Sequence, residues 1–140
     1  EAIHFLAEDN GEPVGAMRLI AFSDKEQFFR GLYELPLNFA SLDVKKVLEI
    51  SRVTLLKRAR SGRSFLKMLE AAHQYALNRD IDYFCGTLRV ELYRRIRIIG
   101  LNFCFVSEPF PYHDHEKWKI VAFLSPIKEN MKGIRGKLTI

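Results

Sequence analysis

The sequence predicts an α/β (α+β) fold: a mixed, twisted β-sheet with a central βαβα unit, helices on both faces and a C-terminal antiparallel hairpin. A run of β-branched and aliphatic residues at 47–56 leads through a basic turn into a helical pattern. A second strand and helix follow from residue 81, and an Asn-Gly pair separates two alternating runs near the N-terminus. The 140 residues, 48% of them hydrophobic, are enough for one domain spanning 1–140.

The first two strands are expected at 3–8 and 13–21, with a turn at 9–11. Asn10 and Gly11 favour the tight turn of a β-hairpin because both tolerate a left-handed backbone. Residues 24–33 have the pattern of a short helix that ends before Pro36, and the remainder of 23–44 is expected to be a loop. The N-terminal third is therefore predicted to be a hairpin followed by a long connection.

The central unit is expected to run from a strand at 47–56 through a helix to a strand at 81–88. The helix has an apolar face at helical spacing, formed by Phe65, Leu69, Ala72 and Ala76. A second helix at 90–99 ends at Gly100, and strands at 102–108 and 118–124 form the C-terminal hairpin. The part from 47 to 108 should begin as a parallel sheet with right-handed crossovers. Residues 126–140 are expected to form a tail or an edge extension.

Charged residues inside the strands are the main candidates for chemistry. Glu49 and Arg52 interrupt an apolar run, and burying an unpaired charge is costly, so each needs a partner or a role. Glu49 is a candidate general base, while Arg52 and Arg18 would hold Glu49 or bind the carboxylate of an acceptor. A structural ion pair is the alternative for all three residues. Strict alternation places Glu49 and Arg52 on opposite faces, so a bulge or a splay must bring them together.

The turn at 57–64 is a candidate anion site. It combines a helix N-terminus with cations and a glycine, which suits a phosphate or an acidic partner. The residues that would take part are Lys57, Arg58, Arg60, Gly62, Arg63 and Ser64. The net charge of +5 also favours an anionic partner, although a solvated surface run is the alternative.

Several segments resemble the GNAT N-acyltransferases. They are Val-Gly-Ala-Met-Arg-Leu at 14–19, Glu-Ile-Ser-Arg at 49–52, and the tract 93–103 followed by Ser-Glu-Pro at 107–109. Within that group the sequence is similar to the acyl-homoserine lactone synthases (autoinducer synthases) and to the long-chain N-acyl amino acid synthases. This resemblance implies transfer of a fatty acyl group from an acyl carrier protein or acyl-CoA thioester to the amine of an amino acid. Leu-Pro-Leu at 35–37 favours the amino acid synthases.

The resemblance also implies roles for individual residues. Tyr93 would protonate the leaving thiolate, and the thioester arm would lie in a gap between the fourth and fifth strands. Leu55, Phe84 and Phe103 would line the acyl chain, with core packing as the alternative. In this fold the loop that binds coenzyme A has two glycines, and only Gly62 is present here. The missing glycine suits a carrier-protein donor. The N-terminal helices of the family are not visible ahead of Glu1.

Two other functions compete with this one: lactone synthesis from S-adenosylmethionine, and a non-catalytic module that binds an acyl carrier. A nucleic-acid partner is not expected, because no known reader motif is present. No tightly bound cofactor or metal is expected either, and the His-Asp-His-Glu tract at 113–116 is predicted to be a surface loop. Cys85 and Cys104 are expected to be buried reduced thiols in a cytoplasmic protein, and no apolar run approaches the roughly 20 residues of a membrane span.

Overall fold

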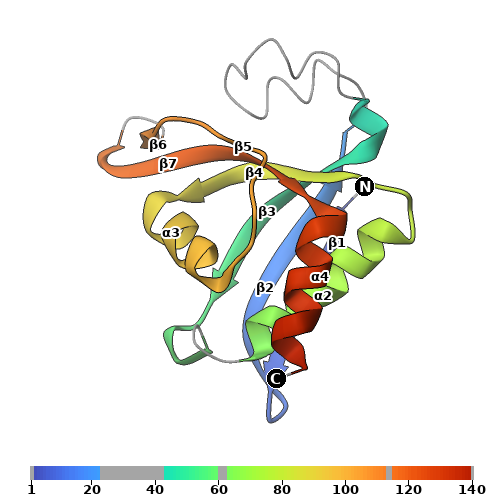
Figure 1. Cartoon of the computed structure of the whole chain (residues 1–140). Helices are drawn as coiled ribbons and strands as arrows, with labels where there is room; N and C mark the ends of the chain where they lie inside the picture. The colour runs from blue at the N-terminus through green and yellow to red at the C-terminus, as the bar shows by residue number, and fades with distance from the viewer. Residues whose placement is uncertain (1, 23–42, 60–62, 113–114, 140) are drawn as a thin grey trace.

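The computed structural model describes residues 2–22, 43–59, 63–112 and 115–139, which form one seven-stranded mixed sheet and three α-helices (Figure 1). The strands are β1 (Ala2–Asp9), β2 (Glu12–Ala21), β3 (Val47–Leu55), β4 (Tyr83–Arg89), β5 (Phe105–Val106), β6 (Phe110–Tyr112) and β7 (His115–Pro126). The helices are α2 (Arg63–Leu77), α3 (Val90–Ile99) and α4 (Ile127–Leu138), with short 3-10 turns η2 (Val44–Lys46) and η3 (Lys57–Ala59). The predicted fold class is confirmed.

Strands β1 and β2 form the predicted hairpin. Their register runs from Ala2↔Ile20 to Asp9↔Glu12, and the turn between them is made by Asn10 and Gly11. These two residues have φ angles of 52° and 79°, and this left-handed pair is what a two-residue hairpin turn requires. The local sequence therefore determines this part of the fold.

The strand order is β1-β2-β3-β4-β7-β5, with β6 also paired to β7. β3 and β4 are parallel, as predicted, but β5 does not lie next to β4, because β7 is inserted between them. The C-terminal strands are antiparallel as expected, with both β5 and β6 paired to β7. Helix α3 has the predicted bounds, and Gly100 ends it with a φ of 98°.

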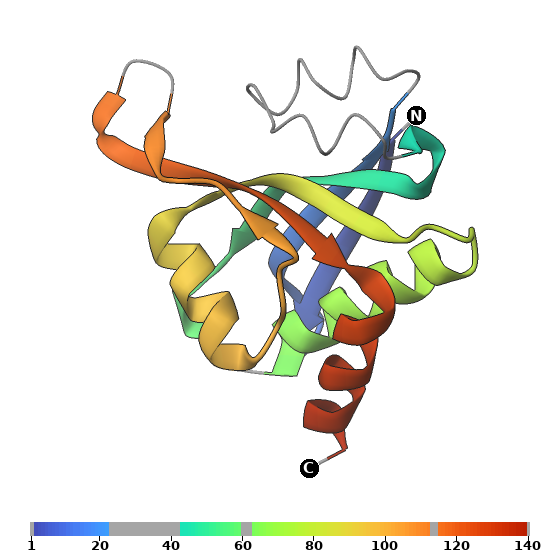
Figure 2. The same cartoon turned by 45° about the horizontal axis from the view of Figure 1, so that its top comes forward.

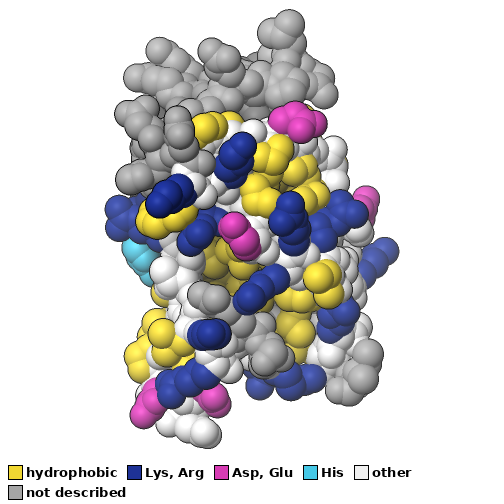
Figure 3. Space-filling model, turned by 90° about the vertical axis from the view of Figure 1, so that its left-hand side faces the viewer, with side chains coloured by type: hydrophobic (Ala, Val, Ile, Leu, Met, Phe, Trp, Pro, Cys, Tyr) yellow, Lys and Arg dark blue, Asp and Glu magenta, His cyan; other side chains and the backbone are white. Residues whose placement is uncertain are grey.

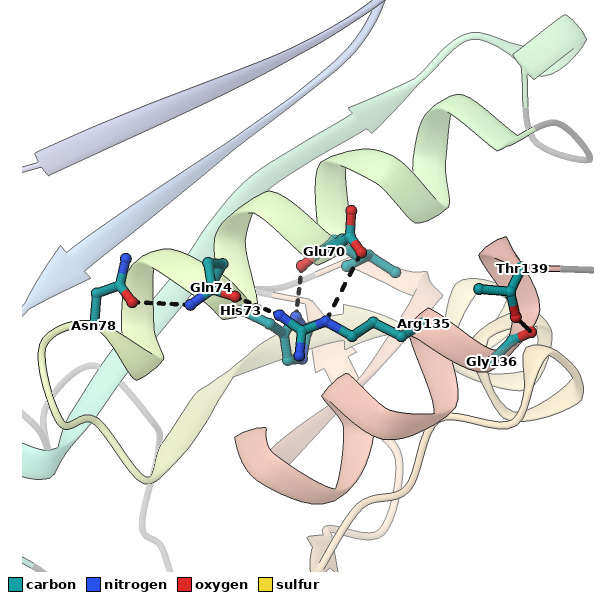
Figure 4. A network of polar contacts seen from close by, with 8 residues as sticks. Glu70, His73, Gln74, Asn78, Arg135, Gly136 and Thr139 are labelled. Carbon is teal, nitrogen blue, oxygen red and sulfur yellow. Dashed lines mark hydrogen bonds and ion pairs between the residues drawn. The ribbon is translucent and has the colours of Figure 1, made fainter.

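The prediction for residues 126–140 is wrong, because residues 127–138 form helix α4. Its apolar residues recur at helical spacing and are buried or partly buried: Ile127, Met131, Ile134 and Leu138. α4 packs along α2, where Arg135 reaches Gln74 and Glu70 (Figure 4). Two glycines within α4, at 133 and 136, obscured this periodicity in the sequence.

A buried polar residue joins α4 to the rest of the fold. The amide of Asn130 accepts a hydrogen bond from the backbone N–H of Asn102 at 2.7 Å and donates to its carbonyl oxygen at 2.9 Å. It also donates to the Ser125 hydroxyl at 2.7 Å. These bonds fix the start of α4 against the loop that follows α3.

All three helices lie against one face of the sheet (Figures 1 and 2). The main core between them includes Met17, Phe84 and Phe123, while a smaller cluster on the other face contains Val47 and Cys85. The helix predicted at 24–33 lies outside the described residues, so helices are described on one face only. Within the described ranges, no helix is both long and apolar enough to cross a membrane.

The two cysteines are free, but only one of them is buried. Cys85 lies in β4, and burial raises the pKa of its thiol. Cys104 lies in the loop before β5 and is exposed, so the prediction that both thiols are buried in strands is wrong for this residue.

Candidate active site

Strands β3 and β4 begin as neighbours and then separate. Three register pairs join them, the last being Glu49↔Cys85, whereas seven pairs join β4 to β7. Gly86 follows directly, and a Cβ atom on this residue would lie 2.5 Å from the carbonyl oxygen of Ile50. A glycine is therefore required where the two backbones are closest, just before the strands diverge.

A cavity of about 530 Å³ lies between the diverging ends of these strands. Its walls come from the ends of β3 and β4, the first turn of α2 and one side of α3. The lining residues are Val53, Thr54, Leu55, Phe65, Arg89, Glu91, Leu92, Arg95, Ile96 and Ile99. The surface of this cavity is thus apolar in its interior and carries charged residues on the α3 side.

A second, smaller cavity of about 40 Å³ adjoins the first and shares Val53, Phe65 and Ile96 with it. Its other lining residues are Met17, Ile50, Leu69, His73, Phe84, Leu88, Leu101, Phe103, Phe123 and Ser125. Of the three residues proposed for the acyl chain, Leu55 lines the larger cavity, and Phe84 and Phe103 line the smaller one. They also belong to the core or pack against it, so both predicted roles remain compatible with their positions.

Glu49 lies at the vertex of the gap, next to Arg18, and it is not among the residues that line the two cavities described above. Register partners point to the same face of a sheet, and Arg18 pairs with Ser51, two residues beyond Glu49 on the same strand. The Arg18 Nε donates to the Ser51 hydroxyl at 3.0 Å. Burial raises the pKa of the half-buried Glu49 carboxyl, and the Arg18 charge lowers this pKa in part. The structure therefore brings together two of the three predicted charged residues.

Arg52 occupies a β-bulge. The register changes from Arg18↔Ser51 to Ala16↔Thr54, so three steps on β3 oppose two steps on β2. Arg52 adopts a φ of 51° at this irregularity, and its side chain is exposed. The expected bulge is present, but among the described groups Arg18 is the arginine that affects the pKa of Glu49.

Tyr93 is not brought to the larger cavity by the described structure. Its ring packs against Phe103, with ring centroids 5.2 Å apart, and its hydroxyl accepts a hydrogen bond from Arg97 at 3.2 Å. The residues of α3 that line the larger cavity lie on a different side of the helix.

The basic turn before α2 is only partly described, because Arg60 and Gly62 lie outside the described residues. Arg58 forms an ion pair with Glu12 at 3.0 Å, and Arg63 donates to the carbonyl oxygen of Leu138. Lys57 is exposed in η3, and Ser64 lies half-buried in the first turn of α2. Phe65 in the same turn lines the cavity, so the N-terminus of α2 lies beside it. Of the tract at 113–116, His115 and Glu116 belong to β7, so the surface-loop prediction is wrong for these two residues, and 113–114 lie outside the described residues.

No protein-family model matches this sequence, and no curated protein matches it. Solved structures do match its fold. BjaI, a CoA-dependent acyl-homoserine lactone synthase solved with SAM and isopentyl-CoA, has a TM-score of 0.70 and 16% identity over 99% of this chain. MesI, another CoA-dependent acyl-homoserine lactone synthase, has a TM-score of 0.71 and 19% identity over 99% of this chain. An N-acetyltransferase from Staphylococcus aureus Mu50 has a TM-score of 0.59 and 10% identity over 90%.

The chain has a GNAT-like fold. The predicted resemblance is therefore confirmed at the level of the fold, which is what these identities support. The chain spans 65% of the length of BjaI, 69% of MesI and 68% of the S. aureus enzyme.

Within this GNAT-like fold, sequence reasoning missed several residues of the site. Ser51 belongs to the Glu-x-Ser-Arg segment, but its type and spacing alone do not indicate that it orients Arg18. Gly86 was detectable as an isolated glycine in a strand, which often marks a close backbone approach. Arg95, which lines the larger cavity, had no signal in the sequence that separated it from the other arginines of α3.

Proposed function

We propose that this chain is an N-acyltransferase. It moves a fatty acyl group from the thioester of an acyl carrier protein or coenzyme A to the amine of an amino acid or a similar small acceptor, giving an N-acyl amino acid. The observation that carries the proposal is the half-buried carboxyl of Glu49 beside Arg18, at the last register pair before β3 and β4 diverge. A proton acceptor thus lies at the point where the two strands begin to separate.

Glu49 acts as the general base. The amine nitrogen attacks the thioester carbon, and the proton that it loses passes to Glu49, directly or through a water. Burial strengthens this base because it raises the carboxyl pKa, while Arg18 favours the ionised form that accepts the proton. Ser51 positions Arg18 for this purpose through its hydrogen bond. When the adduct collapses, the carbon–sulfur bond breaks and the thiolate takes up a proton from water, while Glu49 returns the proton that it accepted to water.

The separated strand edges hold the donor. Backbone N–H groups at the edge of β3 stabilise the oxyanion of the tetrahedral adduct. The fatty acyl chain occupies the two adjoining cavities, whose shared walls are Val53, Phe65 and Ile96. The N-terminus of α2 lies beside the same cavity through Phe65, and a helix N-terminus suits the phosphate of a phosphopantetheine arm.

An acidic carrier protein is the donor we favour. Only one glycine of the coenzyme A loop is present in the turn, at position 62, and the face of the molecule around α3 is rich in Lys and Arg side chains with fewer acidic ones (Figure 3). Exposed arginines of α3 and the adjacent strand are charge-complementary to such a partner: Arg89, Arg94, Arg95 and Arg97.

Acyl-homoserine lactone synthesis is the second candidate, because BjaI and MesI are acyl-homoserine lactone synthases. In that case S-adenosylmethionine supplies the acylated amine. Mass spectrometry of lipids from cells that express the full-length protein separates the two candidates. An N-acyl amino acid supports the first, and a homoserine lactone supports the second.

The role of Glu49 is tested with the purified protein, an acyl carrier protein or coenzyme A thioester, and a mixture of amino acids. We expect Glu49→Gln to lower kcat/KM by about 100-fold or more, the range of general-base catalysis. Glu108→Gln is the matched control, since Glu108 is exposed, whereas Glu49 is half-buried beside Arg18. Equal activity of Glu49→Gln and the unmodified protein would remove the base assignment. Absence of turnover with every donor and acceptor would favour a binding module.

A further inference from the structure

His73 is a buried polar residue that the proposed mechanism does not use. It lies on α2 with 2% of its surface exposed, and its ring meets Phe84 of β4 edge-to-face with centroids 4.9 Å apart. The imidazole is therefore held between the helix and the sheet. It also lines the smaller cavity, which adjoins the larger one at the strand gap.

The hydrogen bonding of His73 leaves one ring nitrogen unused. Nδ1 lies 2.6 Å from the carbonyl oxygen of Leu69, one turn earlier on the same helix (Figure 4). Because a carbonyl only accepts, Nδ1 carries the proton and donates it. In the neutral ring Nε2 is then an acceptor. Nε2 is buried and has no hydrogen-bond partner within the described part of the chain.

The described residues around this nitrogen supply no partner for it. The cavity is lined by apolar side chains apart from His73 and Ser125. The Ser125 hydroxyl already donates to the carbonyl oxygen of Asn102 at 3.3 Å and accepts from Asn130 at 2.7 Å. Burial also keeps the ring neutral, since it lowers the pKa of His73 to about 4. Buried acceptors without a partner are uncommon in folded proteins, and such an atom in a cavity is satisfied by a ligand group or by an ordered water.

We propose that Nε2 of His73 accepts a hydrogen bond from a hydroxyl group on the acyl chain, so that His73 selects hydroxylated fatty acyl donors. This rests on the proposed acyl-transferase function. A hydroxyl supplies the proton that the nitrogen lone pair requires. A keto oxygen has no proton to donate, and a methylene leaves the nitrogen unpaired. His73 is thus a specificity-determining residue and takes no part in the chemical step.

Binding is tested without turnover by nuclear magnetic resonance of the protein labelled with nitrogen-15 at histidine. The probes are decanoyl pantetheine analogues in which an amide replaces the thioester, with one hydroxyl at successive odd-numbered carbons. We expect one hydroxylated analogue to shift the Nε2 resonance of His73, whereas the unsubstituted and keto analogues do not. A resonance that is already at the hydrogen-bonded position without ligand, and that no analogue moves, would mean an ordered water only and would overturn the proposal.

Selectivity is then measured with the corresponding thioesters. For the unmodified protein we expect kcat/KM to favour the best hydroxylated donor over the unsubstituted one by about tenfold, the factor that one hydrogen bond supplies. In His73→Phe, which keeps an aromatic ring against Phe84, this ratio should fall to about one. The same ratio in both proteins contradicts the proposal. Failure of every donor to react defeats the acyl-transferase function instead, while the nitrogen resonance still reports whether the hydroxyl is bound.

Discussion

His73 should make the stability of the fold depend on pH. Its pKa is 6.5 in an unfolded chain, and burial lowers it to about 4 in the fold. As the pH falls from 6.5 toward 4, the unfolded chain therefore gains a proton that the folded chain excludes. The stabilisation is complete above pH 6.5 and is lost as the pH falls through this window. A pKa shift of this size contributes about 3 kcal/mol to the free energy of unfolding, and about 2 kcal/mol of this contribution is lost at about pH 5.

The assay is urea unfolding of the unmodified protein and of His73→Phe between pH 7 and pH 5. Other titrating groups affect both proteins alike, so the difference between the two isolates His73. We expect the unmodified protein to lose about 2 kcal/mol more than the variant over this range. The phenyl ring also removes an unsatisfied acceptor, so the variant should retain its fold. Parallel losses in the two proteins would refute the claim that His73 is buried and neutral.

Three further predictions concern the strand gap, the base and the anchor of α4. Gly86→Ala should destabilise the fold by about 1–3 kcal/mol in urea unfolding, because a Cβ meets a backbone oxygen of β3 at 2.5 Å. In the control Gly133→Ala the added Cβ meets open space on α4, so this variant should stabilise the fold by about 0.5–1 kcal/mol. Equal changes in stability for the two variants would contradict the argument. Arg18→Gln should move the acidic limb of the pH–rate profile to higher pH, because Arg18 lowers the pKa of Glu49; an unmoved limb argues against this pairing. Asn130→Ala should cost about 2–3 kcal/mol in thermal unfolding, since three hydrogen bonds are lost; a cost near zero would show that water replaces them.

The parts of the fold that short sequence signals determine were predictable. Asn10 and Gly11 specify the hairpin because few other pairs adopt two left-handed residues in succession. Gly100 likewise ends α3 at the predicted residue, since the C-cap adopts a left-handed conformation. α4 carried an equally regular apolar pattern, but its two glycines lower helix propensity, and packing against α2 compensates for this.

The parts that depend on distant contacts were not predictable. The insertion of β7 between β4 and β5 is decided by pairing between remote segments, which no local pattern encodes. The proximity of Glu49 and Arg18 followed from neighbouring strands, but the bulge at Arg52 depends on how β2 and β3 align. The basic residues of the turn at 57–64 are neighbours in the sequence, but the hydrogen-bond partners of Arg58 and Arg63 lie 46 and 75 residues away.

The strand gap gives binding of the proposed donor a physical basis that is independent of any one side chain. β3 pairs with β2 on both sides of the bulge at Arg52, and β4 pairs with β7 along its whole length, so the edges of β3 and β4 that face each other beyond Glu49 have no register pairs. Backbone groups at such edges require hydrogen-bond partners. A pantetheine arm carries amide groups on an extended chain and can supply them. A non-catalytic binding module would use the same strand edges, because these edges bind the pantetheine arm and take no part in the reaction. The half-buried carboxyl of Glu49 is therefore the feature that distinguishes an enzyme from a binding module. Burying a carboxylate costs free energy, and this cost has no function in a module that only binds the arm.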